Sequence, residues 1–283
     1  MKFQLYDNTS SFGKDTLGIL LEQEVQNNLL VGFIRNDLEC DTAKWLMSTI
    51  KDEDGNVLLT AACTPPFNIV LFETANRPNN AAVQCLSNEL KALGFVMPGV
   101  LAERGLAARF AEAHVGPSAF HRHLSMNIMR LDKVNGLPRA SGRCRPLCED
   151  DLFYIPYWER AFGEECRVEY YDILTHVDQL KKRIGKDTHY IWEDGVPVSQ
   201  VVHGRSTENG AVINGVYTPP HYRGRGYASA AVATLSQLLL DRGNKFCCLF
   251  ADADNPISCG IYRKLGFVDQ CVYDDLAFQV PKD

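Results

Sequence analysis

The residues best suited to chemistry lie in one stretch near the C-terminal end, Tyr217-Thr-Pro-Pro-His-Tyr-Arg-Gly-Arg-Gly-Tyr-Ala-Ser229. An apolar strand stops there, two prolines turn the chain, and a long helix follows. The first amides of a helix have no intrahelical partner and sit at the positive end of the helix dipole, so they attract anions. Gly224 and Gly226 let the backbone approach a bulky anion, and Arg223 and Arg225 add positive charge. This pattern predicts a pyrophosphate-binding loop, although glycine-rich turns before helices also occur without a ligand.

A second stretch with chemical potential is Asn255-Pro-Ile-Ser-Cys-Gly-Ile-Tyr-Arg-Lys-Leu-Gly-Phe267. Asn255 followed by Pro256 is typical of a helix start, and Gly266 of a helix end. On that helix Tyr262 shares a face with Ser258 and Leu265. A tyrosine in this setting is by itself an ordinary half-buried residue, so a catalytic role depends on its surroundings.

Composition excludes several classes of protein. The chain has 283 residues, 46% of them apolar and 23% charged, which suits one large or two ordinary globular domains. A net charge of −6 gives no reason to expect a nucleic-acid partner. No apolar run approaches the roughly 20 residues of a membrane span, and the first residues lack the apolar core of a signal peptide. We therefore expect a cytoplasmic protein without membrane attachment.

Cysteine and histidine are more consistent with structural roles than with a metal site. The ten cysteines are scattered without C-x-x-C pairs, and we interpret them as reduced thiols. His121-Arg-His123 precedes the alternating strand pattern of Met126 to Leu131, so we interpret it as an exposed strand entry. We expect no metal.

The supporting elements divide into two units joined by a turn-rich segment from Lys133 to Gly142. We expect an N-terminal domain over 1–135 and a C-terminal domain over 142–283. Alternating helices and strands in the first domain indicate a mixed α/β sheet. They are a helix over Leu17–Gln26, strands over Val57–Ala62 and Phe67–Phe72, and helices over Ala81–Leu93 and Ala102–His114.

The second domain begins with a strand, two helices and an antiparallel meander of three strands. The first chemical stretch then leads through a helical crossover into a strand parallel to the preceding one, and the second leads through a short helix to two strands that close the sheet. The expected elements are strands over Arg143–Leu147, His189–Glu193, Val196–Arg205, Ala211–Thr218 and Phe246–Ala251, helices over Gly226–Arg242 and Asn255–Leu265, and two closing strands over Phe267–Tyr273 and Leu276–Val280.

Two tripeptides, Thr-Pro-Pro and Leu-Gly-Phe, occur in both halves of the chain. Cys63-Thr-Pro-Pro is similar to Tyr217-Thr-Pro-Pro, and Leu93-Gly-Phe to Leu265-Gly-Phe. Either the first domain is a degenerate copy that has lost the anion-binding loop, or the similarity is chance.

With Arg223-Gly-Arg-Gly-Tyr-Ala228 and Asn255 to Phe267 in this order, the chain resembles the GCN5-related N-acetyltransferases. The resemblance covers roughly residues 142 to 280. It implies a mixed α/β acyl-CoA N-acyltransferase fold, an acyl-CoA donor such as acetyl-CoA, and an acceptor that is a small-molecule or peptide amine. The N-terminal half looks like the divergent partner domain of some two-domain members, and the oligomeric state is open.

The resemblance also implies an opening between the strand that ends at Thr218 and the strand Phe246–Ala251. Gly215 predicts a bulge there, and the prolines after Thr218 cannot donate ladder hydrogen bonds. Backbone groups of Val216, Tyr217 and Thr218 would then pair with the pantetheine arm. The pyrophosphate would rest on the loop opened by Arg223 and Gly224, on the amides of Arg225, Gly226, Tyr227, Ala228 and Ser229.

In the implied reaction an amine attacks the thioester, and a strand N–H near Val216 or Tyr217 stabilises the oxyanion. Tyr262 holds the family's general-acid position for the departing thiolate. Asn255 and Ser258 face the cofactor, and Asn255 also caps its helix.

The base that deprotonates the amine is not evident, because the strand Ala211–Thr218 carries no acidic residue. Asp252 is the first candidate, followed by Glu193 and His203, and a water chain to solvent would also serve. Each of the three side chains also suits a surface or structural role.

Two other functions fit part of the pattern. A dinucleotide-binding Rossmann unit would use Gly224-x-Gly-x-x-Ser229 with Asp252, but six residues separate the strand from the first glycine and the preceding strands form a meander. A catalytically silent acyl-CoA sensor would keep the loop and lack the transfer reaction.

Overall fold

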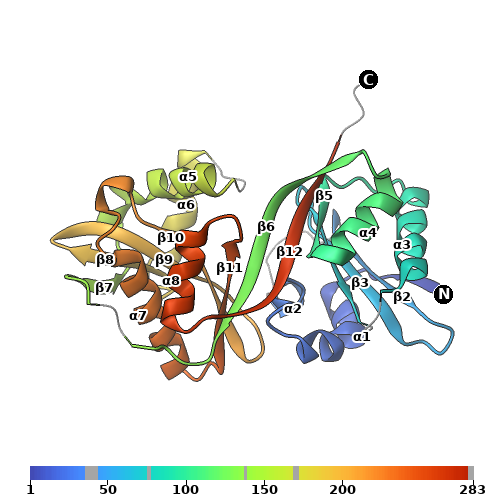
Figure 1. Ribbon diagram of the computed structural model, residues 1–283, viewed down its shortest axis with the longest axis horizontal. Coiled ribbons are helices and arrows are strands. Elements are labelled where there is room, and N and C mark those ends of the chain that lie inside the picture. The colour runs from blue at the N-terminus through green and yellow to red at the C-terminus, as the bar shows by residue number, and fades with distance from the viewer. Residues whose placement is uncertain (36–43, 75–77, 137–138, 168–171, 280–283) are drawn as a thin grey trace. The chain divides into compact units, whose positions relative to one another are not determined.

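The computed structural model describes residues 1–35, 44–74, 78–136, 139–167 and 172–279. The chain forms two compact units, and each has its own core (Figure 1). Unit 1 comprises Met1–Ile128 and Gln270–Asp283, and unit 2 comprises Met129–Asp269. The chain therefore passes between the units twice, once within strand β6 and once within strand β12.

Both units are built from the same order of elements: strand, two helices, three strands, helix, strand, helix, strand. The first series comprises β1 (Lys2–Leu5), α1 (Thr9–Glu22), α2 (Asn28–Arg35), β2 (Leu46–Lys51), β3 (Val57–Cys63), β4 (Ile69–Glu73), α3 (Asn80–Ala92), β5 (Gly99–Glu103), α4 (Arg104–Val115) and β6 (Phe120–Leu131).

The second series adds two short 3₁₀ turns, η2 and η3. It comprises β7 (Arg143–Pro146), η2 (Glu149–Phe153), α5 (Ile155–Cys166), α6 (Ile173–Arg183), β8 (His189–Asp194), β9 (Val196–Ser206), β10 (Gly210–Tyr217), η3 (Pro220–Tyr222), α7 (Tyr227–Asp241), β11 (Phe246–Asp252), α8 (Pro256–Leu265) and β12 (Val268–Phe278).

The repeated order of elements supports a duplicated fold, but the two repeated tripeptides do not occupy equivalent positions in it. Cys63-Thr-Pro-Pro follows β3, the second strand of its meander, whereas Tyr217-Thr-Pro-Pro follows β10, the third strand. Leu93-Gly-Phe follows α3, the first crossover helix, whereas Leu265-Gly-Phe follows α8, the second. The repeated tripeptides are therefore coincidental, and the duplication is seen in the order of the elements.

In unit 2, β8, β9 and β10 form the expected antiparallel meander, and β11 pairs with β10 in parallel through α7. Figure 1 shows α7 and α8 packed with β11. The main core lies between α7 and the sheet, with Val201, Ile213, Leu235 and Leu249 all buried. A smaller core beneath η2, α5 and α6 covers the opposite face of β8.

The prediction of two closing strands was wrong. A single strand, β12, runs from Val268 to Phe278, and its residues Tyr273–Ala277 pair with β5 of unit 1. Asp274 and Asp275, the residues left between the two expected strands, instead take part in this ladder, opposite Ala102 and Leu101. Pairing with a strand about 170 residues away in sequence keeps these two residues in β12, although aspartate is depleted in strands. Val280 lies outside the described residues.

In unit 1 several boundaries differ from the predicted ones. The helix expected over Leu17–Gln26 begins earlier, where Asn8 caps α1 by accepting from Ser11 N–H at 2.8 Å. The helix expected from Ala102 begins at Arg104, because Glu103 accepts hydrogen bonds from the amides that follow it. The sequence analysis also missed β1, α2 and β2. His121 and His123 lie inside β6, not before it.

Candidate functional site

The central feature of the site is the divergence of β10 and β11. Their parallel pairing comprises Gly210↔Phe246, Ala211↔Cys247 and Val212↔Cys248. Beyond this last pair β10 continues to Tyr217 and β11 to Asp252. The recorded pairing between the two strands therefore ends before their C-terminal halves, whose facing backbone groups are not paired with each other. This is the place where the resemblance implies an opening.

A bulge at Gly215 shapes one wall of this opening, as predicted. The register of β10 against β9 shifts between Asn214↔Val202 and Tyr217↔Gln200. Gly215 has φ +58°, and a Cβ there would lie 2.9 Å from a methyl of Val202. Glycine is therefore required by conformation and by space. The bulge interrupts the ladder at Gly215 and Val216, and pairing with β9 resumes at Tyr217↔Gln200.

The predicted anion-binding loop follows η3 and leads directly into α7. Gly224 and Gly226 have φ +78° and +83°, and Gly226 is the N-cap residue, so no side chain caps this helix. The first helical hydrogen bond runs from Ala230 N–H to Gly226 O at 3.0 Å. The preceding amides, including those of Tyr227, Ala228 and Ser229, are left outside the helical pattern. This terminus fits an anionic group such as a diphosphate.

The arginines of the loop differ in their contacts. The Arg223 side chain donates from Nε to Thr218 O at 2.8 Å and from Nη2 to both oxygens of Glu165, at 2.8 and 2.7 Å. It thus joins the end of β10 to α5. Arg225 is exposed, and its charge helps to hold the pKa of Asp194 below its usual value, behind the hydrogen bonds from Ser141 and Tyr227. Arg225 is the better placed of the two as a mobile counter-charge.

Helix α8 carries Tyr262, the predicted general acid. Asn255 caps it by accepting from Ser258 N–H at 3.1 Å, and the Ser258 hydroxyl donates to Asn255 O. The ring of Tyr262 lies edge-on to Phe267 at 5.8 Å. Burial raises the pKa of the Tyr262 phenol, and the neighbouring Cys166 and Cys259 act in the same direction. The phenol is therefore protonated at neutral pH and able to donate.

The end of α5 lies close to both strand ends, which the sequence did not indicate. Glu165 binds Arg223 after β10, and Arg167 lies 3.7 Å from the carboxylate of Asp252 at the end of β11. Between them, Cys166 is near Tyr262, and burial raises the pKa of this thiol to about 11. Sequence spacing does not reveal such a cluster, because α5 ends about 45 residues before β10 and about 80 residues before β11.

The three candidate bases all have other contacts. Asp252 Oδ1 accepts from Asp254 N–H at 2.9 Å, and Oδ2 pairs with Arg167. Glu193 pairs with Arg143 and Arg145, which lower its pKa. Burial lowers the pKa of His203, whose Nε2 lies 3.1 Å from the Ser206 hydroxyl. Asp252 lies nearest the opening by its place on β11.

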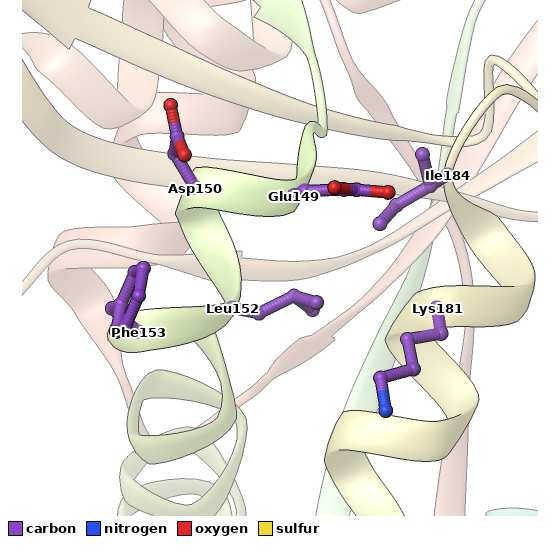
Figure 2. A pocket seen from close by; sticks show the side chains of 6 residues that line it. All are labelled: Glu149, Asp150, Leu152, Phe153, Lys181 and Ile184. Carbon is purple, nitrogen blue, oxygen red and sulfur yellow. The ribbon is translucent and has the colours of Figure 1, made fainter.

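A separate surface pocket of about 570 Å³ lies between η2 and α6 (Figure 2). None of the predicted site residues lines it. Its wall is formed by Glu149, Asp150, Leu152, Phe153, Lys181 and Ile184. Figure 2 shows the acidic side chains on η2 and the ammonium group of Lys181 on α6.

Other kinds of site find no support in the part of the chain that the structure describes. Within those residues no cluster of three His, Cys, Asp or Glu could hold a metal ion. No described helix is both long and apolar enough to cross a bilayer. Nine described cysteines are free thiols, and Cys40 lies outside the described residues. The antiparallel β8–β9–β10 meander also departs from the alternating units of a Rossmann fold.

Comparisons with known proteins agree with this geometry. Residues 153–267 match the model of the acetyltransferase (GNAT) family. No curated protein sequence matches the chain. Among solved structures, the fold is similar to a Drosophila protein (TM-score 0.67, 14% identity, 99% of each chain covered).

Two further structures are similar over nearly the whole chain. One is a GCN5-related N-acetyltransferase from Sphaerobacter thermophilus (TM-score 0.67, 14% identity, 99% of this chain and 97% of that chain). The other is a tandem GNAT protein from the clavulanic acid biosynthesis pathway (TM-score 0.55, 14% identity, 100% and 99%). At such identities the likeness concerns the fold, and the family signature rests on unit 2. Together these findings show the signature of the acetyltransferase (GNAT) family in unit 2 and, over the whole chain, a fold similar to that of a tandem GNAT protein.

Proposed function

We propose that unit 2 transfers an acyl group, acetyl in the simplest case, from CoA to a primary amine. The observation that carries this proposal is the divergence of β10 from β11 next to the uncapped start of α7. In this assignment the backbone of Val216, Tyr217 and Thr218 pairs with the pantetheine arm. The diphosphate lies on the loop from Arg223 to Ser229, with Gly224, Arg225, Gly226, Tyr227 and Ala228 between them.

The reaction proceeds by direct attack. The amine nitrogen forms a bond to the thioester carbonyl carbon, and a β10 amide near the Gly215 bulge stabilises the oxyanion. The carbon–sulfur bond then breaks, and its electrons leave with the sulfur. Tyr262 gives its phenolic proton to this thiolate. Asn255 fixes the start of α8, while Ser258 lies one turn before Tyr262 on the same helix face.

Thiol release from acetyl-CoA, measured with a panel of primary amines, tests the function. The wild-type protein should release CoA thiol with at least one amine, and Tyr262→Phe should slow release about 10²-fold or more without weakening CoA binding. Turnover unaltered by Tyr262→Phe would remove this residue from the mechanism. CoA binding without thiol release for any amine would indicate an acyl-CoA sensor instead.

A further inference from the structure

The structure places a carboxylate of α5 beside the bulge of β10, where the strand has no acidic residue. Gln200 on β9 is fully buried, and its Nε2 donates to Glu159 Oε1 at 3.0 Å and to Gly215 O at 3.2 Å. Because both partners are acceptors, these contacts fix Nε2 as the nitrogen. Glu159 and the carbonyl oxygen of Gly215 are thus linked through the side chain of Gln200.

Within the described residues, the other oxygen of this carboxylate accepts no hydrogen bond from the protein. Apart from Gln200, the polar contact of Glu159 is Arg183 on α6, whose Nη1 lies 4.0 Å from Oε1. Among the residues that the structure describes, none donates to Glu159 Oε2. The side chain is 16% exposed, so it is mostly covered yet still reachable. A carboxylate oxygen in such a position is costly to leave without a cationic or hydrogen-bonding partner.

Aromatic rings are contributed by the residue next to Glu159 and by β10. Trp158, the neighbour of Glu159 on α5, lies 5.8 Å from the ring of Tyr154 and 6.3 Å from that of Tyr217 on β10. Aromatic faces attract ammonium groups, and a carboxylate supplies the opposite charge. This combination suits a cationic amine.

Ionisable groups on the elements packed around Glu159 include Arg183 and His176 of α6, His189 of β8 and Tyr217 of β10. His189 is buried, and its burial, helped by Arg183, lowers its pKa to about 3, so its ring is neutral. Burial raises the pKa of Tyr217, so this phenol is also neutral near pH 7. Arg183 is the cationic side chain that pairs with Glu159 here.

We infer that Glu159, held by Gln200, receives the acceptor ammonium and takes the proton that must leave before attack. This inference rests on the proposed function. An ammonium loses one proton on becoming a nucleophile and a second on becoming an amide. Glu159 accepts the first proton and passes it to solvent. Tyr262 protonates the departing thiolate, and the second proton of the amine restores the Tyr262 phenol, so that the reaction releases one proton in total. The acceptor class is thus a primary amine that is cationic in solution.

The test is Glu159→Gln in the full chain, assayed for thiol release with acetyl-CoA and the amine panel from pH 6 to 10. The glutamine side chain has the same shape as glutamate, and its carbonyl oxygen can still accept the hydrogen bond from Gln200. The fold and the affinity for CoA should therefore persist. We expect kcat/KM near pH 7 to fall about 10²-fold or more. The loss should shrink toward pH 10, because an amine with a pKa of about 10.4 is then increasingly unprotonated without help.

Two further variants sharpen the test. Glu164→Gln changes an exposed glutamate of the same helix that pairs with Arg160, and should behave as wild type. Glu159→Asp keeps the carboxylate and should restore part of the activity. A wild-type pH profile in Glu159→Gln would overturn this inference and leave the proposed function intact. Absence of thiol release by the wild-type protein would instead overturn the proposed function, and the inference with it.

Discussion

The two units use equivalent elements to opposite effect at one place, the start of the first crossover helix. In unit 2 the N-cap of α7 is Gly226, which has no side chain to offer. In unit 1 the N-cap of α3 is Asn79, which accepts from Ala82 N–H at 3.0 Å. The backbone N–H of Asn79 in turn donates to the carboxylate of Glu73, which also binds Arg109 at 2.6 Å. The helix end that is open in unit 2 is therefore satisfied internally in unit 1.

Strand divergence alone does not distinguish the units. In unit 1 the parallel pairing of β4 with β5 comprises Ile69↔Val100 and Val70↔Leu101, and β4 continues to Glu73. Both units thus contain a parallel pair that stops short. The difference lies in the helix terminus, where unit 1 places an asparagine cap and a carboxylate and unit 2 places glycines. An anion site requires the terminus to remain unsatisfied, so we assign CoA to unit 2.

The largest expected effect comes from closing the open terminus. Gly226→Leu adds a side chain at φ +83°, which strains the loop and fills the space in front of the amides. CoA binding measured by calorimetry should become undetectable. Gly243→Leu is the matched control, because Gly243 has φ +99° at the other end of α7. It should carry a similar backbone cost and retain CoA affinity. Unchanged affinity in Gly226→Leu would refute the loop as the anion site.

Acidic pH should affect the stability of the two units in opposite directions through two aspartates. Asp151 of unit 2 is fully buried. Burial raises its pKa, but hydrogen bonds from Arg145, the Cys148 amide and Tyr154 outweigh this and lower it overall. Its stabilising contribution is complete above the unfolded pKa of about 3.9 and is lost as the pH falls through the lower folded pKa. Asp151→Asn should cost about 3 kcal/mol at pH 7, measured by urea unfolding.

Asp275 of unit 1 provides the opposite case. Burial raises its pKa although His123 and Asn68 act against this. A carboxyl group with a raised folded pKa weakens the fold when ionised, so acidification through that pKa favours folding. Asp275→Asn should therefore leave stability at pH 7 unchanged or raise it, within about 1 kcal/mol. A large loss in this variant would contradict the assigned sign.

A smaller effect should separate two asparagine caps. Asn79 caps α3 in unit 1 and Asn255 caps α8 in unit 2, each through a hydrogen bond to the third following amide. Replacement of either by alanine should cost about 1 kcal/mol in the free energy of unfolding. Only Asn255→Ala should also lower thiol release. Equal turnover in the two variants would assign Asn255 to capping alone.

The smallest expected effect concerns Arg223. Its pair with Glu165 is half-exposed, with side chains 47% and 45% accessible. Glu165→Gln should change stability by less than about 1 kcal/mol, because water screens such pairs. The freed charge of Arg223 should strengthen CoA binding by less than about tenfold. Weaker CoA binding in this variant would mean that the Glu165 contact holds the loop in its binding form.

The parts of unit 2 predictable from sequence are those whose signals are local. Pro219 and Pro220, the glycines of the loop and the Asn255-Pro256 helix start each determine backbone conformation within a few residues. These signals predicted β10, α7, β11 and α8 nearly to their ends. Glu159 could not be found in this way, because its link to Gly215 depends on packing of α5 against strands 40 to 60 residues later. β12 was mispredicted for the same reason, since its partner β5 lies far away in sequence.

The placement of β12 has a consequence for biosynthesis. Unit 1 obtains its last strand from residues beyond Gln270, after the whole of unit 2 has been translated. N-terminal domains generally fold first as the chain emerges from the ribosome. Here unit 1 cannot complete the pairing of β5 until the residues that follow unit 2 have been synthesised, so it cannot reach its native state before unit 2 has been made.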